Sequence, residues 1–207
     1  MIRSGIHTLT MGMLRAAQSP DGLRQVSNPA RVVREYGPRG VGHFELSLDI
    51  NVLLQGAREC ELAVAQTREA LRDVGATCSV HLPFRGVDIS YPSRDVAEGY
   101  ARMMAGVVRL ARPLSPMAYV VHPTGDFAKR LRDFAQIFPV LQKTWDTSLF
   151  ALETLARLGG IQPEELAVEN LSHPLAMNDY ILERLPVSAC LDAGHIAADH
   201  SGDGWTV

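Results

Sequence analysis

Four short apolar runs decide the fold: Thr77-Cys-Ser-Val-His81, Ala118-Tyr-Val-Val-His122, Leu166-Ala-Val-Glu169 and Ser188-Ala-Cys-Leu-Asp192. Their aliphatic and β-branched side chains show almost no polar alternation, which is typical of parallel strands buried on both faces. Each run ends in an imidazole or a carboxylate, which suits chemistry better than packing. The carboxyl ends of parallel barrel strands meet at one rim, where active sites lie. The runs therefore predict a parallel α/β sheet with a functional carboxyl edge.

Helix signals separate these strands and extend the pattern toward the N-terminus. Asn28 and Pro29 should begin a helix that Gly37 ends, and Gly75 should supply the left-handed cap of the next one. Ser93 should begin a helix whose apolar side chains recur at helical spacing, namely Val96, Tyr100, Met103, Val107 and Leu110. Further helices are expected over residues 58–74, 126–138, 141–158 and 175–185, and further strands over residues 2–9, 44–50 and 187–192. Strands separated by helices imply βαβ crossovers.

The number of units limits the choice of architecture. Six strand–helix units fit into 207 residues, whereas an eight-unit barrel typically needs about 250. The glycine-rich dinucleotide-binding fingerprint is absent after the first strand. We therefore expect one incomplete domain over residues 1–207, a (β/α) TIM-type barrel truncated after about six βα units. An open doubly wound sheet is the alternative.

The composition is ordinary for a soluble globular protein, with 46% hydrophobic residues, 21% charged residues and a net charge of −3. This balance gives no indication of a nucleic-acid or anionic-membrane partner. The sequence has no apolar run of about 18 residues and no signal-peptide pattern. Its three cysteines lack C-x-x-C spacing, which favours a reducing cytoplasm. A cytoplasmic protein is expected, and the oligomeric state is not indicated.

Residues that can bind a metal close four successive strands. Taken singly, each has an ordinary interpretation: a hydrogen-bonded histidine, or a carboxylate that caps a helix or pairs with an arginine. Together, however, they include buried carboxylates, and burying an unpaired carboxylate away from water is costly. A shared divalent cation would offset that cost. Nitrogen and oxygen ligands without cysteine suit zinc, manganese or iron. The predicted metal ligands are His81, His122, Glu169, Asp192 and His195.

The other residues that could take part in catalysis or metal binding have ordinary structural explanations. The remaining histidines are interpreted as structural or solvent-facing: His7, His43, His173 and His200. No nucleophile elbow accompanies the serines, so a Ser-His-Asp hydrolase is not expected. No site for an organic cofactor is indicated.

The strand ends resemble the xylose-isomerase-like barrel superfamily, which includes apurinic-endonuclease-type metal enzymes. The stretches that carry the resemblance begin at about residue 42 and are Ser79-Val-His-Leu-Pro83, Val120-Val-His-Pro-Thr-Gly125, Val168-Glu-Asn-Leu171 and Leu191-Asp-Ala-Gly-His195. Family ligands from strands 7 and 8 have no counterpart in this sequence.

Within that superfamily, the chain is similar to cobamide-remodelling phosphodiesterases, for example over Pro163-Glu-Glu-Leu-Ala-Val-Glu-Asn-Leu-Ser-His-Pro174. The resemblance implies a metal-dependent hydrolase that cleaves the nucleotide loop of a cobamide. In it Glu169 would be the catalytic, bridging ligand and the metal would lower the pKa of a bound water.

Two alternatives stay open. One is an isomerase or epimerase of a sugar or sugar phosphate with a single divalent ion, in which Glu169 and Asp192 bind metal beside the carbon whose proton moves. Histidines at strands 3 and 4 favour the hydrolase, and an isomerase would need a further acid or base from strand 8. The other is a barrel that binds a small molecule without turnover. Apurinic DNA is disfavoured by the charge balance.

Overall fold

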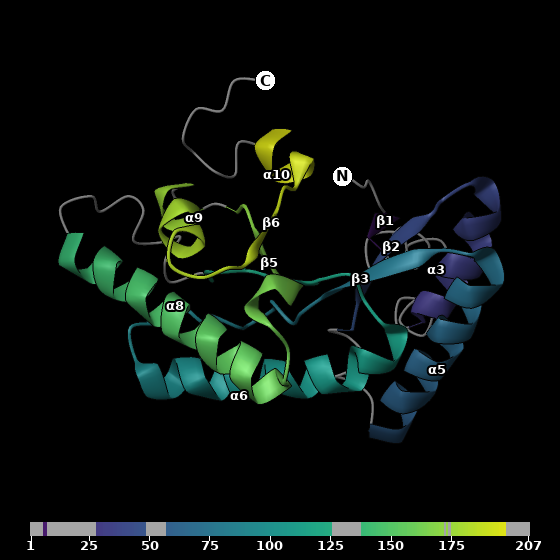
Figure 1. The fold of residues 1–207 in the computed structure, drawn as a ribbon, viewed down its shortest axis with the longest axis horizontal. Coiled ribbons are helices and arrows are strands. Elements are labelled where there is room, and N and C mark those ends of the chain that lie inside the picture. The colour runs from purple at the N-terminus through teal and green to yellow at the C-terminus, as the bar shows by residue number, and fades with distance from the viewer. Residues whose placement is uncertain are drawn as a thin grey trace. The chain divides into compact units, whose positions relative to one another are not determined.

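The computed structural model describes residues 6–7, 28–48, 57–125, 138–171, 173 and 175–197. In these ranges helices alternate with short strands, as the sequence predicts (Figure 1). The chain forms two compact units, one of Met1–Pro83 with Val107–Tyr119 and one of Phe84–Gly106 with Val120–Val207. Strand order within each unit follows the chain, β1-β2-β3 in the first and β4-β5-β6 in the second. The prediction of one domain stays a prediction.

The strands of the first unit are β1 (Ile6–His7), β2 (His43–Ser47) and β3 (Thr77–His81). All pair in parallel, with His7 opposite Glu45 and Ser47 opposite His81. The segment leading to the next strand joins β3, because the Met117 N–H donates to the Cys78 carbonyl at 2.8 Å. Residues 2–5, 8–9, 49 and 50 of the expected strands lie outside the described residues.

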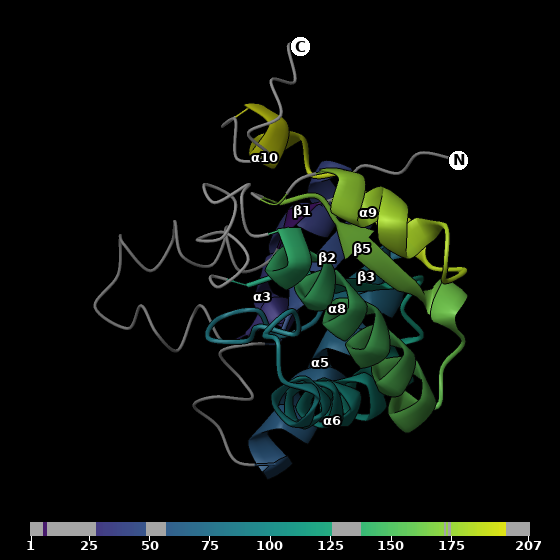
Figure 2. The ribbon, with the colours of Figure 1, turned by 90° about the vertical axis from the view of Figure 1, so that its left-hand side faces the viewer.

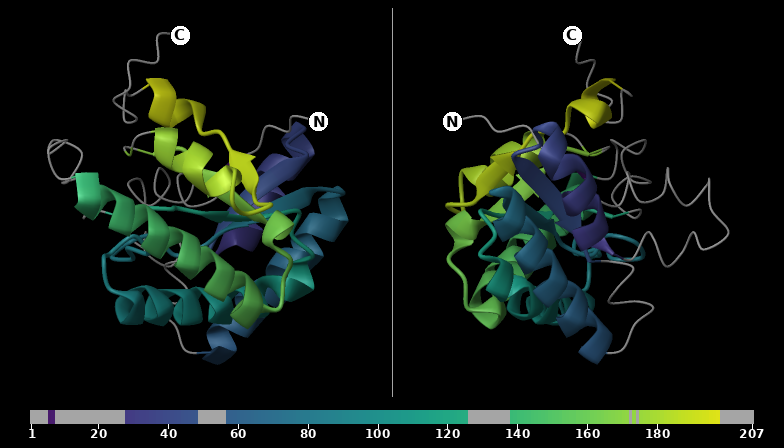
Figure 3. Two further views of the ribbon diagram at one scale, coloured as in Figure 1. Left: turned by 60° about the vertical axis from the view of Figure 1, so that its left-hand side comes forward. Right: turned by 90° about the vertical axis from the view of Figure 1, so that its right-hand side faces the viewer.

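Helices α3 (Pro29–Tyr36) and α5 (Ala57–Val74) lie side by side in this unit (Figure 3). The predicted helix from Pro29 to Tyr36, ended by Gly37, is confirmed. Gly37 keeps a right-handed φ of −55°, the chain continues as a 3₁₀ turn to Arg39, and Gly40 is left-handed at φ 94°. Glycine is needed at 37 for space, since a Cβ there would lie 2.7 Å from the Val74 side chain of α5. The left-handed Gly75, at φ 66°, is confirmed.

Helix α6 (Arg94–Ala111) begins in the second unit and ends in the first, followed by a 3₁₀ turn over Arg112–Leu114. Its buried face consists mainly of small side chains: Ala97, Ala101, Met104, Ala105, Val107, Val108 and Ala111. Of the five predicted apolar positions, Val107 is buried, Tyr100 and Leu110 are half-buried, and Val96 and Met103 are exposed. The periodicity therefore predicts the helix correctly, but the largest apolar side chains do not mark its buried face.

The second unit contains most of β4 (Tyr119–Val121), with β5 (Leu166–Glu169) and β6 (Ser188–Cys190). Its helices are α8 (Phe138–Gly159), α9 (Leu175–Leu182) and the short α10 (Ala193–Ala197). Helices α8 and α9 pack together (Figure 2). Fully buried side chains of the unit include Leu152, Leu155, Leu166, Met177 and Ile181. Strands β5 and β6 are parallel, with Glu169 opposite Cys190.

Helix bounds in this unit differ from expectation in two places. Helix α9 ends at Leu182, three residues before the predicted end, and α8 begins at Phe138 rather than Leu141. The helix expected over 126–138 lies outside the described residues, apart from its last position. Among the described helices, none is long and apolar enough to cross a lipid bilayer.

Candidate metal centre

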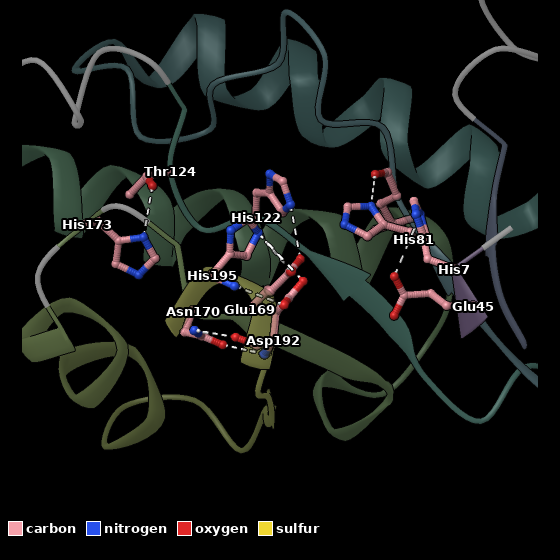
Figure 4. Close-up of polar contacts among 11 residues, drawn as sticks. His7, Glu45, His81, His122, Thr124, Glu169, Asn170, His173, Asp192 and His195 are labelled. Atoms are coloured by element: carbon pink, nitrogen blue, oxygen red, sulfur yellow. Dashed lines mark hydrogen bonds and ion pairs between the residues drawn. The ribbon is translucent and has the colours of Figure 1, made fainter. Parts of the chain in front are cut away.

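Glu169 is the central residue of a polar cluster in the second unit. It ends β5, where the run Leu166-Ala-Val-Glu is buried throughout, and its side chain is only 6% exposed. Figure 4 shows His122 and His195 pointing toward its carboxylate. Nε2 of His122 lies 3.0 Å from one carboxylate oxygen and Nε2 of His195 lies 3.4 Å from the other. Each oxygen of a buried carboxylate therefore faces an imidazole.

His122 stands immediately after β4, at the start of the turn His122-Pro123-Thr124-Gly125. Proline keeps the backbone of the preceding residue extended, so the strand direction is maintained to the point where the chain turns away. The Phe84 ring packs against the imidazole, with ring centroids 4.8 Å apart and an angle of 42° between the planes. This contact and the Glu169 carboxylate fix the orientation of the imidazole.

The turn after His122 is anchored by three other segments of the second unit. The Ser148 hydroxyl of α8 donates to the Pro123 carbonyl at 2.6 Å. The Thr124 hydroxyl lies 3.1 Å from Nδ1 of buried His173. The Gly125 N–H donates to the Asp88 carboxylate at 3.0 Å. These bonds satisfy polar groups of a buried turn and hold His122 in place.

Asp192 follows β6 and caps α10. Its Oδ1 accepts the backbone N–H of Gly194 at 2.6 Å and of His195 at 3.1 Å, as an N-cap aspartate does. Its other oxygen, Oδ2, lies 3.7 Å from Nε2 of His195. The cap thus sets the first turn of the helix that carries His195, while one oxygen remains directed at the cluster.

Asn170 joins the ends of β5 and β6. Its side chain accepts the Asp192 N–H at 2.6 Å and donates to the Asp192 carbonyl at 3.2 Å. Its own backbone N–H donates to the Cys190 carbonyl at 3.2 Å. Because Asn170 adjoins Glu169, this amide links the position of Asp192 to that of the buried carboxylate (Figure 4).

His81 belongs to the first unit, where it ends β3 and is 4% exposed. Its Nδ1 donates to the Leu82 carbonyl at 2.7 Å, which leaves Nε2 as the remaining ring nitrogen. The ring lies edge-on to His7, with centroids 5.6 Å apart. Nε2 of His7 in turn lies 3.8 Å from a Glu45 oxygen. An imidazole held by a backbone carbonyl through one nitrogen has the arrangement usual for metal-ligating histidines.

The donor set of the second unit fits a divalent ion. Two ligand atoms that each lie about 2.0–2.2 Å from zinc can be separated by at most about 4.4 Å. The separations of His195 Nε2 from the carboxylate oxygens of Glu169 and Asp192, 3.4 and 3.7 Å, are shorter than this limit. Ligand atoms of Glu169, Asp192 and His195 lie within 4.8 Å of one another. His122 lies 3.0 Å from the other oxygen of Glu169 and is not part of this three-residue group. Imidazole and carboxylate ligands suit zinc, manganese or iron.

The structure brings together four of the five predicted ligands: His122, Glu169, Asp192 and His195. For His81 the assignment stays a prediction. The structural interpretation fits His173, which is 1% exposed and bonded through both nitrogens, to Thr124 and to Asn178 at 2.6 Å. His43 lies close to the hydroxyls of Thr77 and Ser79, and His200 lies outside the described residues.

Sequence reasoning missed Phe84 and Asp88 in the second unit, and it quoted Asn170 within the motif Val168-Glu-Asn-Leu171 without giving it a role. Asp88 had one detectable signal, since an aspartate two residues before a serine favours a local side-chain turn. Its carboxylate indeed accepts the Ser90 N–H at 3.0 Å. The amide of Asn170 and the ring of Phe84 act across the fold, and no local pattern specifies their partners.

Comparison with known proteins supports the fold. No family model and no curated protein matches the chain. Among solved structures, it is similar to a D-tagatose 3-epimerase-like protein (TM-score 0.60, 14% identity, covering 94% of this chain and 66% of that one). It is also similar to D-allulose 3-epimerase from Methylomonas sp. in complex with D-allulose (0.56, 15%, 93% and 63%). A third is endonuclease IV from Thermus thermophilus (0.51, 19%, 89% and 65%).

These neighbours are xylose-isomerase-like TIM-barrel proteins, and most of them are sugar epimerases. The chain spans just under two thirds of the length of the three structures. At such identities the likeness concerns the fold alone. The α/β barrel fold with about six βα units is thus confirmed, whereas the expected closeness to cobamide-remodelling enzymes is not shown.

Proposed function

We propose that this protein is a divalent-metal-dependent sugar isomerase or epimerase. The observation that carries the proposal is the carboxylate of Glu169, which is 6% exposed and has an imidazole nitrogen facing each of its oxygens. The epimerases among the structural neighbours support the choice of sugar chemistry over the hydrolase that the sequence first favoured.

Burial makes the Glu169 carboxylate a strong ligand. A buried ionised carboxylate is costly unless it is paired or coordinates a metal, so Glu169 favours a cation at this position. His122 and His195 supply neutral nitrogen ligands on either side, and Asp192 supplies a second carboxylate. His81 is the proposed fifth ligand, on the strength of its place at the end of β3.

The residues of the chain would orient a substrate against this centre. A divalent ion bound by these ligands would polarise a substrate carbonyl and so acidify the adjacent C–H bond. Removal of that proton begins both isomerisation of a ketose and epimerisation next to a carbonyl. The Phe84 ring, packed on His122, excludes water from one side of the imidazole. The Asn170 bridge and the cap on α10 keep Asp192 and His195 in place.

Glu169→Gln tests the metal assignment. The change removes the charge but keeps the shape, so metal content after reconstitution with manganese, measured by elemental analysis, should fall strongly while the fold is kept. Glu183→Gln is the matched control, because Glu183 is 72% exposed and forms an ion pair with neighbouring Arg184. Equal metal content in both variants would refute the assignment.

Substrate chemistry is tested with the reconstituted protein in deuterated water. Ketoses such as D-fructose should gain deuterium at a carbon next to the carbonyl, as detected by mass spectrometry and NMR. Absence of exchange with every ketose tried, while metal is bound, would count against an isomerase.

A metal-dependent phosphodiesterase is the second candidate. The imidazole-rich donor set favours it, because two histidines flank one carboxylate, and endonuclease IV shares the fold. Incubation with a cobamide separates the two functions, since hydrolysis of its nucleotide loop adds water to the products whereas an isomer keeps the substrate's mass. A protein that binds metal and ligand but converts neither would be the non-catalytic barrel.

A further inference from the structure

A tight turn next to His122 presents an arginine. The Val87 N–H donates to the Phe84 carbonyl at 3.3 Å, which closes a four-residue turn over residues 84–87. Gly86 occupies the third position with a φ of 70°, as a type II turn requires. Arg85 is therefore at the exposed second position, where a side chain projects outward.

The side chains of this turn connect Arg85 with the candidate metal centre. The Arg85 guanidinium lies over the Phe84 ring, with its central carbon 5.2 Å from the ring centroid. The same ring also packs against His122, with ring centroids 4.8 Å apart. The guanidinium carbon consequently lies no more than about 10 Å from the centre of the His122 imidazole.

The position of the turn is fixed relative to His122. Asp88, one residue beyond it, accepts the Gly125 N–H at 3.0 Å, and Gly125 ends the turn that His122 begins. The two backbones approach closely, since a Cβ on Gly125 would lie 2.6 Å from the Asp88 side chain. The guanidinium is thus presented from a segment tied to the metal ligand.

Arg85 also lacks a carboxylate partner within the described part of the chain. Other arginines there form ion pairs with acidic side chains: Arg34, Arg39, Arg72, Arg102 and Arg184. A cation over an aromatic face is stabilised while its N–H donors stay available. These donors form a planar fork that suits phosphate.

We propose that Arg85 binds the phosphate group of a phosphorylated sugar whose carbonyl end lies at the metal centre. This inference rests on the proposed function and narrows its substrate class from neutral sugars to sugar phosphates. Arg85 is a specificity residue here, since the bond changes occur at the other end of the substrate. A ligand that bridges the two positions needs a short carbon chain between its carbonyl and its phosphate.

The test compares binding of D-fructose 6-phosphate and D-fructose by calorimetry. The manganese-reconstituted protein should bind the phosphate ester at least about 10-fold more tightly than the neutral sugar. A hydrogen bond to a charged group contributes a binding free energy that corresponds to roughly this ratio of affinities. Arg85→Gln should weaken binding of the ester roughly 10- to 100-fold and leave D-fructose unchanged. Arg85→Lys keeps the positive charge but lacks the planar guanidinium fork, so its affinity for the ester should lie between those of the wild type and Arg85→Gln.

Arg94→Gln is the matched control, because Arg94 also stacks on a phenylalanine, 4.9 Å from the Phe150 centroid. It should leave both affinities unchanged. Equal binding of the two sugars by the wild type, or unchanged ester binding in Arg85→Gln, would overturn the inference. Repeating the titrations without metal separates the proposals, because binding of the ester that depends on Arg85 supports this inference even where no ion is retained.

Discussion

Asn170→Ala tests whether the candidate metal centre depends on the bridge between β5 and β6. The Asn170 side chain is buried, and the residue as a whole is 3% exposed. Its amide makes two hydrogen bonds, both to the backbone of Asp192. Truncation removes both bonds while leaving every proposed ligand in the sequence.

The expected loss of stability follows from the hydrogen bonds that the backbone groups of Asp192 keep in this variant. The Asp192 carbonyl still accepts the Ile196 N–H at 3.3 Å, but its own N–H loses its side-chain acceptor. Each of the two lost hydrogen bonds contributes about 1 kcal/mol to stability, and a buried donor is left unsatisfied. The free energy of unfolding should therefore fall by about 2–4 kcal/mol. For a chain of this length, that lowers Tm by roughly 5–15 °C. Metal affinity should fall about 10- to 100-fold, as is usual when support behind a ligand is lost.

The assay combines thermal unfolding with manganese titration against a chelating dye. Thr147→Ala serves as the control, because it removes one hydrogen bond of 2.7 Å from a buried side chain in α8. It should lower Tm without changing metal affinity. If Asn170→Ala behaves in the same way, the bridge holds only strand ends, and the coupling of Asp192 to metal binding is refuted.

Two further changes test the turn after β4 and the core of the first unit. Gly125→Ala should lower both Tm and manganese affinity, because its Cβ would overlap Asp88; Gly99→Ala, with open space around it, should not. Burial raises the pKa of the Cys78 thiol to about 12, so at pH 8 a disulfide reagent should modify half-buried Cys190 well before Cys78. The folded-state pKa of Cys78 exceeds the ordinary value of 9.0, so its contribution to stability is complete below pH 9 and is lost between pH 9 and about 12. Rapid labelling of Cys78 in the folded protein, or equal behaviour of the two glycine variants, would contradict these expectations.

The sequence was sufficient to predict the strand ends because the signal there is local. An uninterrupted apolar run followed by an imidazole or carboxylate predicted the ends of β3 and β5 at His81 and Glu169 to the residue. Strands of one parallel sheet end on the same edge. That rule was enough to predict the approach of His122 to Glu169, which the structure gives as 3.0 Å.

What the sequence could not supply depends on packing between segments distant in the chain. Gly37 ends α3 as predicted, but it keeps a right-handed φ of −55°, so the left-handed conformation common after a helix is not the reason for glycine there. Its actual constraint is the Val74 side chain, 37 positions away. Likewise, nothing near Phe84 specifies that its ring packs on His122. Such constraints become visible only when the two partners are seen together.

The spacing of Asp192 and His195 shows that a structural and a functional interpretation of one motif can both hold. An aspartate three residues before a histidine is common, and here it has the ordinary explanation, because Oδ1 caps α10 through the Gly194 and His195 N–H groups. The cap uses one carboxylate oxygen only. Oδ2 remains on the side of Nε2 of His195, 3.7 Å away, and that nitrogen lies 3.4 Å from Glu169. The helix turn that Asp192 stabilises is therefore what brings the imidazole to the buried carboxylate, so loss of the cap should also weaken the metal centre.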